Sequence, residues 1–198
     1  MRTTFLFSLL LVISTGLFAQ KIPSAESQIK TAVLAAPEEF REGAKVYGYD
    51  TNGGWTVLRE GNNEMVCIAS DPKRDGFSAS CYHKELEPFM ERGRELTREG
   101  KSFEEIFETR EKEVKEGKLQ MPKDGVTLFV LSADKEDYDP EKGAVQNTNF
   151  RYVVYIPYAT VESTGLPLKP QAPGMPWIMD PGTHRAHIMI TPPPKNKD

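Results

Sequence analysis

The only two cysteines of the chain, Cys67 and Cys81, constrain its fold more than any other pair of residues. Each lies in a short apolar segment, and the turn-forming sequence DPKRDG at 71–76 separates the two segments. If the segments form an antiparallel hairpin and the cysteines are bonded, Cys67 lies opposite Cys81, because a disulfide joins Cα atoms within about 7 Å. Side chains alternate along strands, so Val66 and Tyr82 then share the opposite face. Both faces of the hairpin are apolar, and each needs a cover.

A disulfide requires an oxidising compartment, and the first residues of the chain indicate export. Arg2 is followed by an apolar run over 5–18, and Ala19 precedes the expected cleavage point. A membrane span needs about 20 apolar residues, so this run is short for an anchor, although an uncleaved anchor is the alternative. We predict a signal peptide over 1–19 and an exported chain, periplasmic or secreted. A metal or redox role for the cysteines is less favoured, since they lack the C-x-x-C spacing.

The charge pattern of the mature chain excludes two classes of partner. The formal net charge of the full chain is −4 and the basic residues form no cluster, whereas nucleic acids and anionic membranes are bound through basic faces. No second long apolar run follows the signal, so we expect no membrane contact after cleavage. We expect residues 20–194 to form a single domain and residues 195–198 to be a disordered tail.

The pattern of apolar residues and turns predicts an α+β fold. A helix is expected over 24–36, and the segment 85–120 is expected to form a charged helical pair divided at Gly100. Ser102 and Glu105 have the spacing of a capping box for the second of these helices. Four short segments separated by turns predict an antiparallel meander, namely 45–49, 55–59, 65–70 and 77–83. Two or three further strands complete the antiparallel sheet, over 126–132, 150–158 and 186–191, and the helical pair covers it.

Imidazole and thioether groups near the carboxyl end are ligands that suit copper or zinc, so a metal site is one hypothesis for this segment. The candidate ligands are His184, His187 and Met189, to which Asp180 and His83 can add. The alternative is that methionine fills the core and the histidines form only hydrogen bonds.

A proline every third residue between 167 and 176 has the period of a polyproline II helix. We interpret this segment as a strap packed across the domain, with a ligand groove beside it formed by Trp177, Met175 and Met179. A docking ligand for a partner protein is the alternative.

No motif of the sequence names a reaction. The chain has no G-x-S-x-G, no P-loop and no G-x-G-x-x-G, so the catalytic residues are unknown. The first hypothesis is a non-catalytic exported domain, without a cofactor, that binds a small molecule or a protein. The alternatives are a copper- or zinc-binding periplasmic protein and a hydrolase with a carboxylate pair.

The chain also resembles uncharacterised exported bacterial proteins in three short features. These are the signal ending FAQ, the segment GWT at 54–56 with a cysteine downstream, and AHIMI at 186–190. The resemblance implies export and no particular activity.

Overall fold

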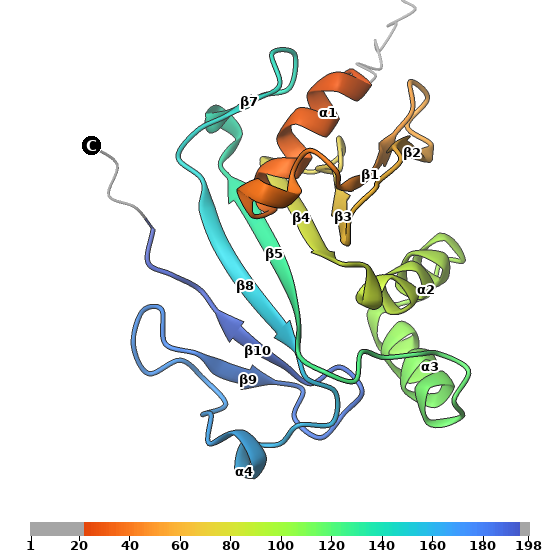
Figure 1. Ribbon diagram of the computed structural model, residues 1–198, viewed down its shortest axis with the longest axis vertical. Helices are drawn as coiled ribbons and strands as arrows, with labels where there is room; N and C mark the ends of the chain where they lie inside the picture. The colour runs from red at the N-terminus through yellow and green to blue at the C-terminus, as the bar shows by residue number, and fades with distance from the viewer. Residues whose placement is uncertain (1–21, 195–198) are drawn as a thin grey trace, which may run out of the picture.

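The computed structural model describes residues 22–194, so the predicted signal peptide (1–19) and tail (195–198) lie outside the described residues. The predicted α+β class is confirmed. Within the described range, eight strands form one mixed sheet in the order β2-β1-β3-β4-β5-β8-β10-β9 (Figure 1). Its strands are β1 (Lys45–Tyr49), β2 (Trp55–Arg59), β3 (Met65–Ile68), β4 (Phe77–His83), β5 (Val126–Ala133), β8 (Asn149–Tyr155), β9 (Trp177–Met179) and β10 (His187–Ile190). A separate ladder joins β6 (Tyr138–Asp139) to β7 (Ala144–Val145).

The three longest helices of the described residues form where the sequence predicts them. Ser24 caps α1 (Ala25–Ala32), which continues as a short 3-10 turn and ends before Pro37. The charged pair consists of α2 (Glu87–Arg98) and α3 (Phe103–Lys115), and the predicted capping box at Ser102 is present. A one-turn helix, α4 (Val161–Thr164), precedes the proline-rich segment.

The disulfide and the register of its hairpin are confirmed. Cys67 is bonded to Cys81, and the two residues lie directly opposite each other in the antiparallel pair β3–β4. The ladder ends at Ile68, and the backbone N–H of Ser78 then bonds to the side chain of Ser70 at 3.0 Å. The cysteine pair is therefore a reliable marker of register in this chain.

The predicted meander is wrong at its second turn. β2 does not pair with β3; instead β3 lies beside β1 and runs parallel to it, with Val46 opposite Cys67. The connection passes across the start of β1, where the N–H groups of Asn62 and Asn63 bond to the carbonyl of Gly43. β3 is almost wholly buried and β2 is half-exposed, so the more apolar strand occupies the inner position and β2 forms the sheet edge.

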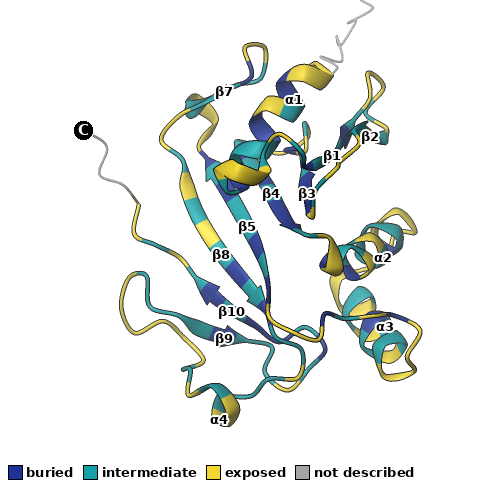
Figure 2. Ribbon diagram, in the orientation of Figure 1, coloured by how far each residue is buried: buried dark blue, intermediate teal, exposed yellow. Residues whose placement is uncertain are grey.

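Two cores lie on opposite faces of the sheet. α1 packs on the cysteine face, in a cluster that includes Ala32, Val46, Cys67, Phe77, Cys81 and Leu131. The segment containing α2 packs on the other face, with Val66, Tyr82, Leu86, Phe89, Leu128 and Tyr155. The helical pair is thus the cover of one face only, and α1 supplies the second cover. Figure 2 shows the resulting burial: β4 and β5 carry buried and intermediate residues only, whereas exposed residues appear at the start of β8.

Four described strands of the carboxyl-terminal half join the main sheet, where two or three were predicted. β5, β8, β10 and β9 follow one another in antiparallel order. The additional strand begins at Trp177, which was expected to line the ligand groove beside the strap. The strap itself is tied to this strand, because the carbonyl of Pro167 accepts the N–H of Ile178 at 3.0 Å.

Candidate binding cleft

A cleft of about 460 Å³ opens between the β1–β2 hairpin and the helical pair. We call it the arginine cleft. No carboxylate of residues 22–194 lines this cleft. Three arginines and three aromatic residues dominate its wall: Arg94, Arg98, Arg110, Tyr49, Trp55 and Phe103. A second hollow of about 420 Å³, the outer hollow, adjoins it and shares Trp55, Arg94 and Arg98 with it. The concentration of positive charge contrasts with the net charge of −4 for the whole chain.

An aromatic platform forms the sheet side of the cleft. The ring of Tyr47 stacks on that of Trp55 at 5.6 Å between centroids, and Tyr49 meets Trp55 edge-on at 5.5 Å. These side chains share one face because Tyr47 lies opposite Val57 and Tyr49 opposite Trp55 in the β1–β2 pair. The platform is the kind of flat, apolar surface on which planar ligand groups stack.

Arg94 joins this platform to α2. Its guanidinium lies 5.2 Å from the Tyr47 ring centroid and 5.5 Å from that of Trp55. Its charge is already balanced, because it bonds to a carboxylate oxygen of Glu87 at 2.6 Å and to the hydroxyl of Tyr82 at 2.9 Å. Arg94 therefore forms part of the wall of the cleft, and its positive charge is already neutralised by Glu87.

Arg110 is different, because it is buried and no carboxylate of residues 22–194 lies within ion-pair distance of it. Only 8% of the residue is exposed, and within residues 22–194 it forms no ion pair. Its Nη1 donates to the carbonyl of Phe89 at 3.2 Å, its guanidinium lies 3.9 Å from the Phe89 ring centroid, and its Nε has no hydrogen-bond partner among the described groups. Burial lowers the pKa of Arg110 to about 10, which still leaves the side chain charged at neutral pH.

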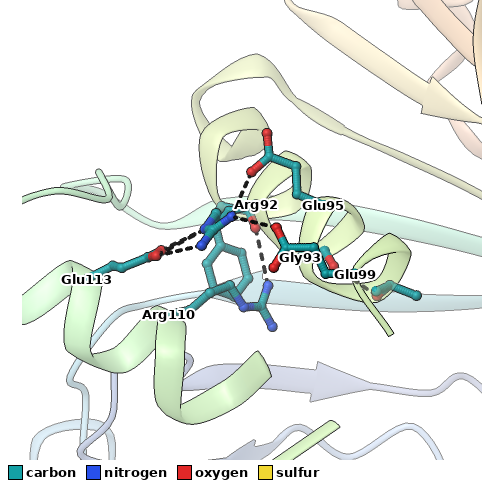
Figure 3. Close-up of polar contacts among 8 residues, drawn as sticks. Arg92, Gly93, Glu95, Glu99, Arg110 and Glu113 are labelled. Atoms are coloured by element: carbon teal, nitrogen blue, oxygen red, sulfur yellow. Dashed lines mark hydrogen bonds and ion pairs between the residues drawn. The ribbon is translucent and has the colours of Figure 1, made fainter. Parts of the chain in front are cut away.

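The backbone of α2 makes room for this side chain at Gly93. A Cβ at that position would lie 2.9 Å from Nη1 of Arg110. The neighbouring Arg92 has the opposite environment: it is more exposed and bonds to Glu113 and Glu95 (Figure 3). The only dashed contact of Arg110 in the same view runs to a backbone oxygen. Among the described residues, Arg110 thus forms no direct bond to a carboxylate, whereas Arg92 is bonded to Glu113, whose charge acts on Arg110 only from farther away.

The predicted metal ligands have separate partners. His184 is fully buried; its Nδ1 and its backbone N–H both bond to a carboxylate oxygen of Glu111, while Phe89 and Phe107 meet its ring edge-on. His187 packs on Tyr155, and His83 is half-exposed beside Glu64.

The two remaining candidates also have partners of their own. Asp180 forms an ion pair with Arg185 at 2.8 Å, and Met189 lies in β10 opposite Trp177. Among the described side chains, no group of three or more His, Cys, Asp or Glu is placed to hold a metal ion. The described residues therefore provide no such set of ligands for copper or zinc.

Only two of the three residues predicted to form the ligand groove beside the strap line the same hollow. Met175 and Trp177 line a hollow of about 440 Å³ under the proline-rich segment. Met179 does not line it and packs against the second core. No charged side chain lines this hollow, so it offers less chemistry than the arginine cleft.

The two buried histidines predict a dependence of stability on pH. Burial lowers the pKa of both His184 and His187 below 6.5. For His184 this effect outweighs that of Glu111, whose hydrogen bond and negative charge raise the pKa. The unfolded chain then binds more protons than the native protein, so stability is fully present above about pH 6.5 and falls as the pH drops. Each histidine adds a slope of up to about 1.4 kcal/mol per pH unit.

Chemical denaturation between about pH 7 and 5 measures this slope. His187→Gln keeps a hydrogen-bond donor without a titrating ring and is expected to make the profile shallower. A free energy of unfolding that stays constant over this range would contradict the expectation.

Comparison with protein-family models, with curated proteins and with solved structures finds no match. The arginine cleft was not predicted from the sequence, although α3 carries a signal for it. Phe103, Phe107 and Val114 lie on one helical stripe, and Arg110 falls on the same stripe, three residues after Phe107 and four before Val114. A cationic residue on the apolar face of a helix indicates a buried charge, and a buried charge needs a partner.

Proposed function

We propose that this protein is an exported binding domain whose arginine cleft takes a ligand with a carboxylate and a flat or apolar body. Arg110 is the observation that carries the proposal. Burying a charge without a partner is costly, and a ligand anion beside the guanidinium would offset that cost. Sites that oppose stability in this way are typical of binding surfaces.

The rest of the cleft supports the same ligand chemistry. Trp55 and Tyr49 provide faces for stacking, and Phe103, 68% exposed at the start of α3, is the most exposed large apolar side chain in the described range. Arg98 is exposed on the last turn of α2 and has no ion-pair partner among residues 22–194, so it can attract an anion toward the opening. An arginine is also suited to a carboxylate, which it can bind through two parallel hydrogen bonds.

The proposal of export rests on the sequence of the first residues and on the disulfide. The bond between Cys67 and Cys81 is of the kind that persists in oxidising compartments. No helix in the described part of the chain is long and apolar enough to cross a membrane.

A matched pair of small molecules tests the binding proposal. Phenylacetate carries a carboxylate on a flat ring, and phenylacetamide has the same body without the charge. By calorimetric titration we expect phenylacetate to bind with a Kd of about 1 mM, as its ten non-hydrogen atoms allow, and the amide at least tenfold more weakly.

Two variants connect this result to the cleft. Arg110→Met fills the same space without the charge and is expected to weaken phenylacetate binding about tenfold, to the level of the amide. Arg92→Met removes an arginine that is already paired and is expected to leave binding unchanged. Equal affinity for acid and amide, or no binding of either at several times the expected Kd, would overturn the proposal.

A further inference from the structure

The outer edge of β2 is open beside the arginine cleft. β2 ends the sheet order, and no strand within the described residues pairs with its outer side (Figure 1). An open edge presents backbone N–H and C=O groups that an extended peptide can pair with.

The hydrogen-bond pattern of the hairpin identifies the residues that face outward. The N–H of Asp50 bonds to the carbonyl of Gly54 at 2.8 Å, so these two residues form a hydrogen-bonded pair. Hydrogen-bonded and non-bonded pairs alternate along an antiparallel ladder. Thr56, opposite Gly48, therefore bonds inward to β1, whereas the backbone groups of Trp55 and Val57 point outward.

The same two residues connect the edge to the two hollows. Trp55 lines both, and Val57, which is 37% exposed, lines the outer hollow together with the intervening Thr56. The arginine cleft, which contains Arg110, thus lies beside Trp55 at the start of β2, and the outer hollow extends along the strand to Val57. The hollows lie next to each other along a strand, as side-chain pockets for an extended peptide do.

We propose that the ligand of the arginine cleft is the carboxyl-terminal end of an extended peptide, which pairs with the edge of β2 through Trp55 and Val57. This inference rests on the proposed function and names its ligand class. The terminal carboxylate bonds to Arg110, and the last side chain, which is apolar, packs among Trp55, Met90 and Ile106. The chain then continues beside Val57, antiparallel to β2, and the side chain two residues earlier enters the outer hollow.

Three probe molecules test whether the cleft binds an extended peptide or only a small carboxylate. They are an acetylated pentapeptide that ends in a free phenylalanine, its carboxyl-terminal amide, and N-acetylphenylalanine. We expect the free pentapeptide to bind about tenfold more tightly than both others, because only it combines the carboxylate with edge pairing.

Hydrogen exchange measured by nuclear magnetic resonance reports the pairing directly. With the free pentapeptide bound, the amides of Trp55 and Val57 are expected to exchange at least tenfold more slowly, whereas that of Thr56, already bonded to β1, changes little. Val57→Pro removes the outward N–H at an edge position that tolerates proline, and Val57→Ala is its control for the lost side chain. Val57→Pro is expected to weaken the pentapeptide several-fold relative to Val57→Ala and to leave N-acetylphenylalanine unaffected.

The outcomes separate this inference from the proposed function. If N-acetylphenylalanine binds as tightly as the pentapeptide, or if the Trp55 and Val57 amides gain no protection, the ligand is not an edge-paired peptide and the inference fails. Phenylacetate binding that depends on Arg110 would then still support the carboxylate site. Failure of all the carboxylates to bind would overturn both.

Discussion

Replacing Cys67 and Cys81 together by alanine is expected to lower the free energy of unfolding by about 3 kcal/mol. The disulfide closes a loop between residues 14 apart, and a closed loop of this length restricts the unfolded chain by about that amount. Both cysteines are fully buried beneath α1, so the substitution also removes packing from the first core. Denaturant unfolding of the variant and of the oxidised wild type measures the difference.

Chemical reduction of the wild type provides the control for this effect. Reduction opens the same loop without removing either sulfur atom, so the reduced protein is expected to lose most of the 3 kcal/mol estimated for the loop. Mass spectrometry before and after reduction confirms the state of the bond. If reduction changes the stability by less than about 1 kcal/mol, the unfolded chain is not restricted by this loop and the prediction is wrong.

The local elements of this fold could be predicted because their signals are local. Ser24 and Pro37 bound the first helix, and the capping box at Ser102 starts α3, as the sequence indicates. The cysteine pair added one non-local fact, the register of β3 on β4. These signals were enough for the fold class and for the boundaries of most elements.

The order of the strands could not be obtained in the same way. The turn-like residues 60–63 are compatible with a hairpin, and a simple meander follows if that hairpin is assumed. Which strand pairs with β1 depends instead on which strand is more apolar and on the contacts that the segment between β2 and β3 makes with residues before β1. Arg59 bonds to the carbonyls of Arg41 and Ala44, and this long-range contact directs the chain across β1.

The site was harder to predict than the fold, since its residues come from distant segments. Trp55 belongs to the first hairpin and Arg110 to the last helix before β5, and neither one alone marks a cleft. The many charges of α3 are typical of a solvated helix surface, which describes Lys112 but not the buried Arg110. Hydrophobic periodicity separates these two residues better than charge composition does.

Replacing Phe89 by alanine is expected to lower the free energy of unfolding by about 3–5 kcal/mol. The side chain is 1% exposed in the second core and meets the rings of Tyr155 and His184, each at 5.6 Å between centroids. Truncation leaves a cavity and takes away the ring on which Arg110 lies. Phe103→Ala removes the same side chain from an exposed position and is the matched control, with an expected change of less than about 0.5 kcal/mol.

Phe89→Leu separates the packing role of this residue from its role at the cleft. Leucine fills much of the space, so we expect a loss of at most about 1.5 kcal/mol and a folded protein in which binding can be measured. The ring beneath the Arg110 guanidinium is absent, however, and the cation–π contact at 3.9 Å is lost. Phenylacetate affinity should therefore fall although no charge has changed, and an unaltered affinity would show that Phe89 does not position Arg110. Since no carboxylate in the described part of the chain is bonded to Arg110, its place in the cleft depends on the ring of Phe89 and on the space left at Gly93.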